Sequence, residues 1–357
     1  MEAIVAGAGL SGCTAARYLA ENGVKVKVHE QKPYVGGLAA DTYDSTAIMV
    51  HRYGPHAFHT NDEGVWEFLS RFTKWRKYEH RVMACTCGKI MPVPVNLDTI
   101  DAAYGKGNFT GRACRENYTV RELLESEDPK LRKVGQWAWD TFYEGYSTKQ
   151  WDCDPKKLPA WIMDRVPVRF NRDGRYHTDK YQAIPQLGYT TLCENMLDHP
   201  NIRLKVKSKV VDPESSIIFT GEIDKLYQCC FGTLPYRYLR FEFEHAKNGP
   251  IQKVAQYNYP DLYVPYTRVV EYRHMTEDDG WSGKTTLCRE TPCYDGETPC
   301  YPIGGKKAEN LHKQYASMAG MGGVWILGRL AEYRYCNMDQ AVRRALNLAD
   351  TYLRTMQ

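Results

Sequence analysis

The chain has 357 residues and is 43% hydrophobic, and its 47 basic and 43 acidic side chains leave a formal net charge of +4. That length allows two or three domains, and the nearly balanced charge argues against nucleic acid or an anionic membrane as a partner. No apolar run reaches the length of a membrane span and no signal peptide precedes the first predicted strand, so we expect a cytoplasmic protein. The 12 cysteines contain no C-x-x-C pair, which favours reduced thiols over a structural zinc site.

The first segments predict a βαβ unit followed by a second helix and a strand region. Residues 2–30 indicate a strand, a glycine turn, a helix and a strand that alternates with period two. Residues 62–74 predict an amphipathic helix, because their apolar side chains recur at helical spacing. Residues 80–97 are typical of strands interrupted by Pro92 and Pro94.

The middle of the chain predicts helices and then β-structure. Residues 118–150 are expected to be helical and to open with a capping box, Thr119 with Glu122. The proline-flanked residues 156–170 predict a mobile loop. Strands are then expected in two further segments, residues 175–185 and 235–290.

The remaining segments return to alternating strand and helix. Residues 189–199 predict a helix and residues 201–210 a strand. Near the end, a strand at 324–327 meets a glycine and a loop before a long amphipathic helix that begins at about Met338. This order resembles the opening βαβ unit and suggests that both ends of the chain build one domain.

A dinucleotide signature follows the first predicted strand. Gly7, Gly9 and Gly12 match G-x-G-x-x-G, open a helix, and are followed by Glu30 at the end of the next strand. Such glycines let backbone amides at a helix N-terminus approach a pyrophosphate, and the acidic residue accepts hydrogen bonds from ribose hydroxyls. A second pair, Gly36-Gly37, follows six residues after Glu30. That pair is typical of FAD proteins and favours FAD over NAD.

Three histidines lie close together in the stretch HRYGPHAFHT. His51, His56 and His59 are separated by five and three residues across Gly54-Pro55, so no regular helix presents them together. No carboxylate or cysteine completes a ligand set, and we expect no metal. The alternatives are structural roles or the wall of a cofactor site.

Six ordered motifs resemble the UDP-galactopyranose mutase family and span nearly the whole chain. They are HRYGPHAFHTND (51–62), YSTKQWD (146–152), LPAWIMDRVPVRF (158–170), YQAIPQLGYTTL (181–192), VPYTRVVEYRH (264–274) and GRLAEYRYCNMDQAV (328–342). The resemblance implies an isomerase that interconverts UDP-galactopyranose and UDP-galactofuranose. It also implies a bound FAD that is active when reduced, whose N5 attacks the anomeric carbon of the sugar, with NAD(P)H or a reductase as electron source and a homodimeric assembly.

The same resemblance implies a role for particular residues. The catalytic ones are His56 beside the flavin and Arg165 and Arg268, which hold the diphosphate of the substrate. The implied cofactor-binding residues are Gly7, Gly9, Gly12, Glu30, Gly36, Gly37, Leu38, His56, Arg329 and Met338. The implied substrate-binding residues are His80, Trp151, Arg165, Tyr176, Tyr181, Arg268, Tyr301 and Tyr335. His51 and His59 are expected to be structural.

The chain departs from the family pattern at a few positions. Asp152 stands where glycine is common, Cys336 where a tyrosine is common and Asn337 where an aspartate is common. His80 replaces an asparagine of some members, and Cys229-Cys230 replaces a more usual Tyr-Arg. These departures bear on substrate affinity and flavin tuning more than on the class of reaction.

The predicted fold is α/β, with a Rossmann-type FAD-binding domain, a helical domain and an antiparallel β-sheet domain. The segments assigned to them are 1–75, 189–232 and 303–357 for FAD binding; 105–160, with a mobile loop to about 170, for the helical domain; and 76–104, 171–188 and 233–302 for the sheet. Two alternatives remain open at this point: an amine-oxidase-like FAD oxidoreductase and a non-catalytic flavin-binding homologue.

Overall fold

The computed structural model describes residues 2–111, 113–210, 217–277 and 282–356. The chain forms two compact units. The first unit, here unit 1, comprises residues 1–78, 179–238 and 294–357; the second, unit 2, comprises residues 79–178 and 239–293. The division into three domains that the sequence predicts remains a prediction.

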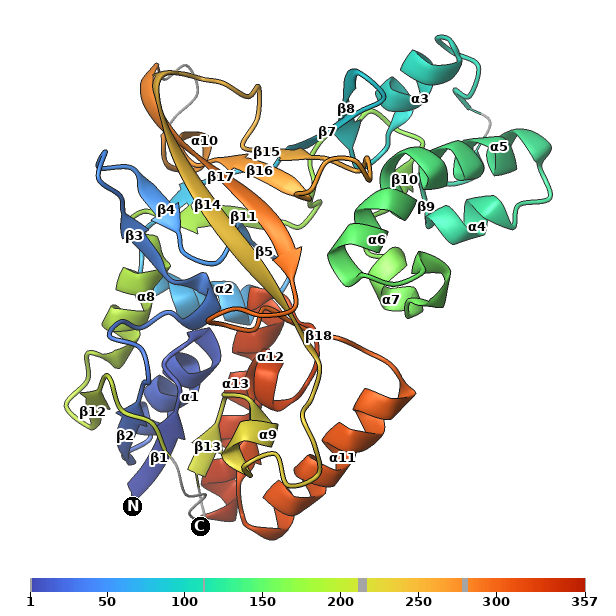
Figure 1. The fold of residues 1–357 in the computed structure, drawn as a ribbon. Coiled ribbons are helices and arrows are strands. Elements are labelled where there is room, and N and C mark those ends of the chain that lie inside the picture. Colours follow the sequence, from blue (N-terminus) through green and yellow to red (C-terminus); the bar gives the residue numbers. More distant parts are fainter. Residues whose placement is uncertain (1, 112, 211–216, 278–281, 357) are drawn as a thin grey trace. The chain divides into compact units, whose positions relative to one another are not determined.

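Unit 1 is built on a parallel five-stranded sheet with the order β12-β2-β1-β13-β19 (Figure 1). Its strands are β1 (Glu2–Ala6), β2 (Lys25–His29), β12 (Ile202–Lys205), β13 (Ile217–Phe219) and β19 (Trp325–Ile326). Helix α1 (Leu10–Glu21) connects β1 to β2, which pair in parallel, so the predicted βαβ unit is confirmed. The alternation of β2 decides the register of this pair: Val26 and Val28 are buried against β1, while Lys25 and Lys27 are exposed.

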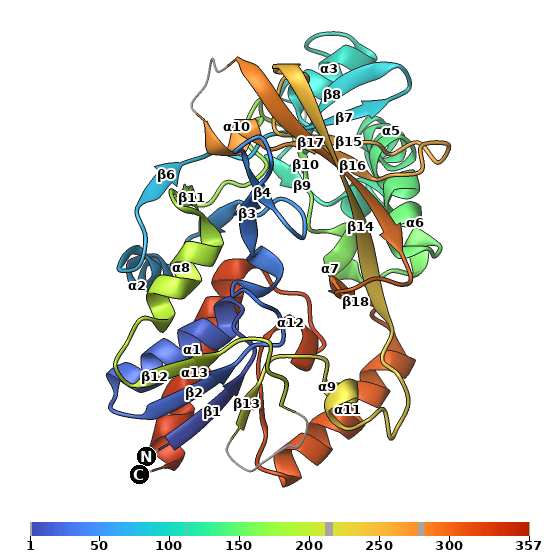
Figure 2. The ribbon, with the colours of Figure 1, turned by 60° about the vertical axis from the view of Figure 1, so that its left-hand side comes forward.

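Helices from both ends of the chain pack on this sheet. Helix α1 packs against α13 (Met338–Thr355) and α8 (Gly188–Leu197), and their apolar faces share one core with α2 (Glu63–Ser70). Figure 2 shows α1 and α13 side by side along the strands. A second core lies under α9 (Ile223–Leu226) and α11 (Lys306–Met321). Helix α11 has no clear signal in the sequence, because only Ala308, Tyr315 and Ala319 of this helix are buried and its apolar stripe is short.

Smaller elements of unit 1 carry the histidine-rich turn. A two-stranded sheet joins β3 (Asp41–Tyr43) to β4 (Met49–His51), and a three-stranded sheet has the order β5-β11-β6. The strands of the latter are β5 (Phe58–Thr60), β6 (Trp75–Lys77) and β11 (Tyr181–Pro185). Two short helical elements, η1 (Gly37–Ala39) and α12 (Gly328–Ala331), follow the second glycine pair and β19 respectively.

Unit 2 contains most of a seven-stranded sheet with the order β18-β14-β17-β16-β15-β7-β8. Its strands are β7 (Val82–Thr86), β8 (Lys89–Val93), β14 (Tyr236–Gly249), β15 (Gln256–Asn258), β16 (Arg268–Glu271), β17 (Gly283–Cys293) and, in unit 1, β18 (Tyr301–Pro302). One pair, β15 with β7, is parallel, so the sheet is not wholly antiparallel as predicted. These two strands are distant in the sequence, and no hairpin sets their direction. Pro92 lies in β8, the edge strand, where a missing N–H disrupts no central ladder.

The predicted helical segment, residues 118–150, is confirmed as a series of short helices. These are α4 (Val120–Leu124), α5 (Pro129–Ala138), a π-helical turn (Trp139–Tyr143) and α6 (Glu144–Trp151). Helix α3 (Leu97–Tyr104) precedes this segment and was not predicted. The segment 156–170, predicted as a loop, contains short regular elements: the end of η3 (Pro155–Lys157), α7 (Ala160–Met163) and β10 (Val168–Arg169), which pairs with β9 (Asn117–Tyr118). The expected capping box of Thr119 and Glu122 opens α4. Among the described residues, no helix is both long enough and apolar enough to cross a membrane.

A glycine of α5 allows α4 and α5 to pack closely, and its replacement should destabilise the fold. A Cβ atom on Gly135 would lie 2.6 Å from Leu123 Cβ, whereas a Cβ atom on Gly320 of α11 would meet nothing within 4 Å. We therefore expect Gly135→Ala to lower the free energy of unfolding by about 1–3 kcal/mol through overpacking. The control Gly320→Ala should leave it unchanged or raise it by up to about 1 kcal/mol, because alanine is the better helix former.

Urea unfolding followed by circular dichroism measures both effects. Equal stability of the two variants would contradict the close packing of α4 on α5.

Candidate functional site: a dinucleotide cavity and its surroundings

Two glycines of the signature leave no room for a side chain. A Cβ atom on Gly12 would lie 2.0 Å from the carbonyl oxygen of Gly7, so α1 can begin this close to β1 only with glycine. Gly7 has φ +108°, and a Cβ atom there would lie 2.0 Å from the Oγ1 atom of Thr220. The turn therefore holds the first amides of α1 directly after the end of β1.

The second glycine pair packs on the first turn. Gly36 donates its N–H to the carbonyl of Ala8 at 2.8 Å. Gly37 has φ +56°, and a Cβ atom there would lie 2.8 Å from the Cα atom of Gly9. Both predicted glycine motifs thus form one continuous wall in which the backbone itself is the surface.

A cavity of about 650 Å³ lies above this wall in unit 1. All ten residues predicted to bind the cofactor line it: Gly7, Gly9, Gly12, Glu30, Gly36, Gly37, Leu38, His56, Arg329 and Met338. Helix α1 opens there with Gly9 as N-cap, no capping side chain and no acidic residue in its first turn. Its N-terminal amides and the positive end of its dipole therefore face the cavity, as a phosphate group requires.

The carboxylate of Glu30 is held at the end of β2 by two backbone amides. Its Oε2 atom accepts a hydrogen bond from the N–H of Ala8 at 2.7 Å, and its Oε1 atom accepts one from the N–H of Lys32 at 2.8 Å. Only 6% of Glu30 is exposed. A carboxylate fixed in this way keeps further lone pairs for ligand hydroxyls, which fits the predicted ribose contact.

The histidine-rich turn uses one histidine to position another. His51 is fully buried, and its Nδ1 atom accepts the backbone N–H of His56 at 2.9 Å. The hydroxyl of Tyr189 donates to the carbonyl of His56 at 3.0 Å, and His56 Nδ1 donates to the carbonyl of Gly54 at 2.7 Å. Burial lowers the pKa of His51 to about 3, so its ring is neutral and acts as an acceptor. His56 is thus fixed at three atoms on the cavity wall.

An arginine and two tyrosines form a compact cluster at the start of α12. Arg329 donates to the carbonyls of Cys300 at 3.0 Å and Cys336 at 2.9 Å. Its guanidinium lies 5.5 Å from the ring centre of Tyr301 and 5.0 Å from that of Tyr335, and the two rings are stacked at 6.1 Å. The structure therefore brings together three residues that the sequence predicts at the flavin and the substrate.

Arg268 in unit 2 is held by a glutamate inside the sheet. It lies directly opposite Glu290 in the pairing of β16 with β17, and its Nε atom donates to Glu290 Oε2 at 2.6 Å. Glu290 is fully buried, and this burial raises the pKa of its carboxyl while the guanidinium of Arg268 lowers it. The buried glutamate therefore fixes the guanidinium through its Nε atom.

Comparison of the sequence with known proteins identifies related proteins along nearly the whole chain. The profile of the family described as UDP-galactopyranose mutase matches residues 141–335, and that of an NAD(P)-binding Rossmann-like domain matches residues 5–72. "Probable UDP-galactopyranose mutase" of Klebsiella pneumoniae is 34% identical, covering 98% of this chain and 94% of its own length. The chain belongs to the UDP-galactopyranose mutase family.

Two further proteins are similar to this chain, one in sequence and one in structure. "dTDP-fucopyranose mutase" of Escherichia coli is 35% identical, and the alignment covers 98% of both chains. The crystal structure of a reduced UDP-galactopyranose mutase superposes with a TM-score of 0.74, at 15% identity, over 99% of this chain and 95% of that one. At that identity the superposition establishes the common α/β fold with its Rossmann-like domain.

The segment that carries Arg165 is anchored at both sides of this residue. Arg165 itself is exposed in the turn after α7. Arg121 of α4 forms an ion pair with Asp164, and the hydroxyl of Tyr143 donates to the carbonyl of Val166 at 2.9 Å. The expected mobility of residues 156–170 remains a prediction, and these two contacts are what an opening motion would have to break.

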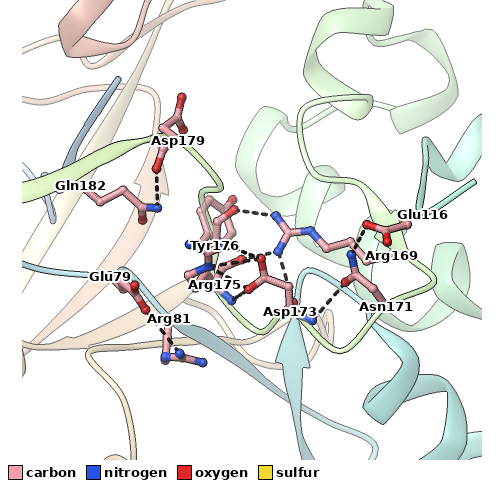
Figure 3. A network of polar contacts seen from close by, with 10 residues as sticks. All are labelled: Glu79, Arg81, Glu116, Arg169, Asn171, Asp173, Arg175, Tyr176, Asp179 and Gln182. Carbon is pink, nitrogen blue, oxygen red and sulfur yellow. Dashed lines mark hydrogen bonds and ion pairs between the residues drawn. The ribbon is translucent and has the colours of Figure 1, made fainter. Parts of the chain in front are cut away.

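A buried arginine organises the turn before Tyr176 (Figure 3). Only 3% of Arg169 is exposed, and its guanidinium donates to the carbonyls of Asp173, Arg175 and Tyr176. Tyr176 in turn donates its N–H to the carbonyl of His80 at 2.7 Å, and the two rings meet edge to face at 5.8 Å. Two predicted substrate-binding residues therefore lie side by side, held by an arginine that the sequence analysis did not single out.

Tyr181 has evident structural partners, and Trp151 lies at the end of a helix. The ring of Tyr181 stacks on Trp66 at 4.7 Å, and its hydroxyl donates to Glu63 at 2.9 Å. Trp151 is half-buried and ends α6. Asp152 follows it with φ +51° and ψ +45°, the left-handed conformation that favours glycine at the end of a helix. The glycine that is common here is thus replaced by a residue that tolerates the same backbone conformation.

The remaining departures also have local explanations. Asn337 is the N-cap of α13 and forms a capping box with Gln340, a role that asparagine and aspartate fill equally well. Cys336 is buried, and its backbone carbonyl accepts from Arg329, a contact that any residue at this position could make. Cys229 lies in a turn with φ +55°. The structure offers no reason for a second cysteine at position 230.

The sequence did not indicate the residues that hydrogen-bond to the predicted site residues and fix their positions. Glu290, Arg169 and Tyr189 hold Arg268, Tyr176 and His56 in place. A charged residue within the apolar alternation of a strand is the only signal that could have indicated Glu290. Nothing in the local sequence indicates the other two, because their partners lie on different elements.

The neutral, buried state of His51 predicts a pH dependence of stability. Below about pH 6.5 the unfolded chain protonates this histidine, whereas the folded chain does so only near pH 3. Stability should therefore fall as the pH decreases through this window, by up to about 1.4 kcal/mol per pH unit. His51→Asn, whose side-chain oxygen can accept the N–H of His56, should remove this part of the dependence.

Urea unfolding at several values between pH 7.5 and pH 5 measures the effect. The stability advantage of the wild type over His51→Asn should shrink as the pH falls. The control Tyr189→Phe removes a hydroxyl next to His56 without removing a group that titrates in this range, and its curve should run parallel to that of the wild type. A parallel curve for His51→Asn would contradict the prediction.

Proposed function

We propose that the protein is an FAD-dependent mutase that interconverts UDP-galactopyranose and UDP-galactofuranose. Family membership establishes the coarser activity, that of a nucleotide-sugar pyranose/furanose mutase. The observation that carries the finer proposal is that one cavity is lined by all ten residues that the family resemblance implies for the cofactor. The match over nearly the whole chain favours this activity over the amine-oxidase-like alternative.

FAD fits the cavity better than NAD for a steric reason. The second glycine pair packs on the first and extends the wall of bare backbone beyond the first turn, which an NAD-only domain does not require. The volume lies within the range of small-molecule sites, about 300–1,000 Å³. The superposed crystal structure is that of a reduced mutase, and a reduced state supports a redox-active cofactor such as a flavin. When bound and reduced, FAD would supply the N5 nucleophile for the anomeric carbon.

Residues of unit 1 would bind and tune this cofactor. The carbonyl of Gly54 only accepts, so His56 Nδ1 carries a proton and donates it in this hydrogen bond. Arg329 places a permanent positive charge on the cavity wall, which stabilises an anionic ring system. The amides at the start of α1 and the carboxylate of Glu30 would hold the pyrophosphate and the ribose.

The other predicted site residues would bind the substrate. We propose that Arg165 and Arg268 hold the diphosphate, because a guanidinium stays protonated and can bind two phosphate oxygens at once. Holding the leaving diphosphate lowers the cost of charge separation when the bond to the anomeric carbon breaks. The tyrosines Tyr176, Tyr181, Tyr301 and Tyr335, together with His80 and Trp151, are proposed to contact the nucleotide and the sugar. The electron donor, NAD(P)H or a reductase, and a homodimeric assembly are part of the same proposal.

A second candidate substrate follows from one relative. The protein named dTDP-fucopyranose mutase is as similar to this chain as the Klebsiella relative is. A clamp of two arginines on a diphosphate does not distinguish the two nucleotide sugars. We therefore propose dTDP-fucopyranose as the alternative substrate for the same site.

Turnover by the reduced protein tests the function. Dithionite-reduced, FAD-loaded protein should convert UDP-galactofuranose to UDP-galactopyranose, and the oxidised protein should not. Chromatographic separation of the nucleotide sugars measures the product, and dTDP-fucofuranose is assayed in parallel. Turnover of the dTDP sugar alone would transfer the proposal to the second candidate. No turnover of either by reduced protein would support a non-catalytic homologue.

Two arginine variants test the diphosphate clamp. Arg268→Ala should nearly abolish turnover while the protein retains FAD. Arg165→Ala should raise the dissociation constant for UDP about ten- to hundred-fold, because a charge-assisted contact contributes about 1.5–3 kcal/mol. Arg354→Ala is the matched control, since its side chain is 77% exposed and pairs with Asp350 within α13. Unchanged turnover and UDP affinity in a site variant would exclude that arginine from the clamp.

A further inference from the structure

The side chain of Lys149 ends inside a ring of backbone carbonyls. Its Nζ atom lies 2.5 Å from the carbonyl oxygen of Tyr259, 3.0 Å from that of Asp261, 2.9 Å from that of Val264 and 2.8 Å from that of Tyr266. An ammonium group has three donors, so four acceptors at these distances surround it much as they would surround a bound cation. A solvated surface lysine makes no such arrangement.

These carbonyls belong to one loop, residues 259–267, that joins β15 to β16. The loop is closed at its base, where Asn258 pairs with Arg268 and the N–H of Tyr259 donates to the carbonyl of Thr267 at 2.9 Å. Its tip is largely in solvent: Leu262 is 63% exposed and Tyr263 82%. Little apolar burial therefore holds the loop, and polar contacts must define its shape.

A second contact independently brings the same loop onto helix α6. A Cβ atom on Gly145 would lie 2.4 Å from the carbonyl oxygen of Pro260, so the loop backbone touches the helix backbone there. Gly145 and Lys149 are four residues apart and lie on the same face of α6. Trp151, proposed to bind substrate, ends this helix, while Arg268 follows the loop directly.

We propose that Lys149 is a positioning residue for substrate binding, which gathers the carbonyls of residues 259–266 and so holds Arg268 in a fixed place relative to Trp151. The inference rests on the proposed function, in which Arg268 holds the diphosphate. Lys149 does not touch the substrate in this scheme. Its effect passes through the loop: without the ammonium group, four carbonyls that converge on one point repel each other, and the loop opens.

The surroundings of Lys149 hold its charge away from water. Burial lowers the pKa of Lys149 to about 8, and the carboxylate of Asp261 opposes this shift. Tyr259 and Tyr266 contact the ammonium through their backbone carbonyls, and the hydroxyl of Thr86 in β7 donates to Asp261 at 2.5 Å. A loop opening that returned Lys149 to water would raise its pKa again, so a rising pH does not by itself open the loop.

Hydrogen exchange and UDP binding on four variants of the full chain test the proposal. Lys149→Met removes the charge at similar length, Lys149→Arg keeps it, and Gly145→Ala displaces the carbonyl of Pro260 without altering any charge. Lys130→Met changes an exposed lysine of α5 and is the control. Faster amide exchange confined to residues 259–267 is expected for Lys149→Met and Gly145→Ala, and UDP affinity should fall about ten-fold or more.

Rescue by the conservative variant gives a readout that loss of packing alone would not produce. At pH 7, Lys149→Arg, which keeps the charge, should retain more loop protection and UDP affinity than Lys149→Met. Unchanged exchange and UDP affinity in Lys149→Met, or a Lys149→Arg variant no better than Lys149→Met, would overturn the inference. If Lys149→Met fails to fold, Gly145→Ala decides the question, because it displaces the loop without altering any charge.

Failure of the proposed function would look different. Exchange of residues 259–267 is measured without substrate and without reduction of the protein. If the wild type neither binds UDP nor turns over a nucleotide sugar, the proposed function fails whatever the loop does. If the wild type does both, and loosening the loop has no effect on UDP binding, only the role of Lys149 fails.

Discussion

The absence of side chains where two glycine turns meet is the constraint on which the cofactor site depends. Gly37 lies against the Cα atom of Gly9, and Gly12 against the carbonyl of Gly7, so that any Cβ atom would push the turns apart. Because the turns touch, helix α1 starts close to the ends of β1 and β2 with its amides facing the cavity. Glu30, His56 and Arg329 then meet on that cavity although they are distant in the sequence.

Unit 2 relies on a different interaction, the capture of backbone carbonyls by buried or half-buried cations. Arg169 collects the carbonyls of the turn before Tyr176, and Lys149 collects those of the loop before Arg268. A cation removed from water must find acceptors, and carbonyls that point inward must find donors. The cation provides donors for the carbonyls, and the carbonyls provide acceptors for the cation. Irregular loops with exposed tips therefore acquire defined shapes. Arg268 itself follows the same rule through the buried Glu290.

Much of the fold followed from local patterns, and the exceptions have physical reasons. The βαβ unit, the helix that begins at Met338 and the capping box at Thr119 were predictable, because each depends on residues within one or two turns. Helix α11 was missed because its buried face consists of only three side chains. The parallel pairing of β15 with β7 was missed because strand direction depends on how distant segments meet. Asp152 departs from the glycine that is common at this position, but it adopts the left-handed conformation that such a glycine would adopt.

Some residues of the candidate site were likewise predictable from the sequence, whereas their hydrogen-bond partners were not. Glycine spacing, the acidic residue after the second strand and the ordered motifs were enough to indicate the family and to predict ten residues that line one cavity, since each of these signals lies within a short stretch of the sequence. Partners such as Glu290 for Arg268, Tyr189 for His56 and the loop carbonyls for Lys149 emerged only after folding. Such pairs satisfy a buried charge or a buried polar atom across separate elements. No local pattern encodes them, because burial itself is a property of the packed chain.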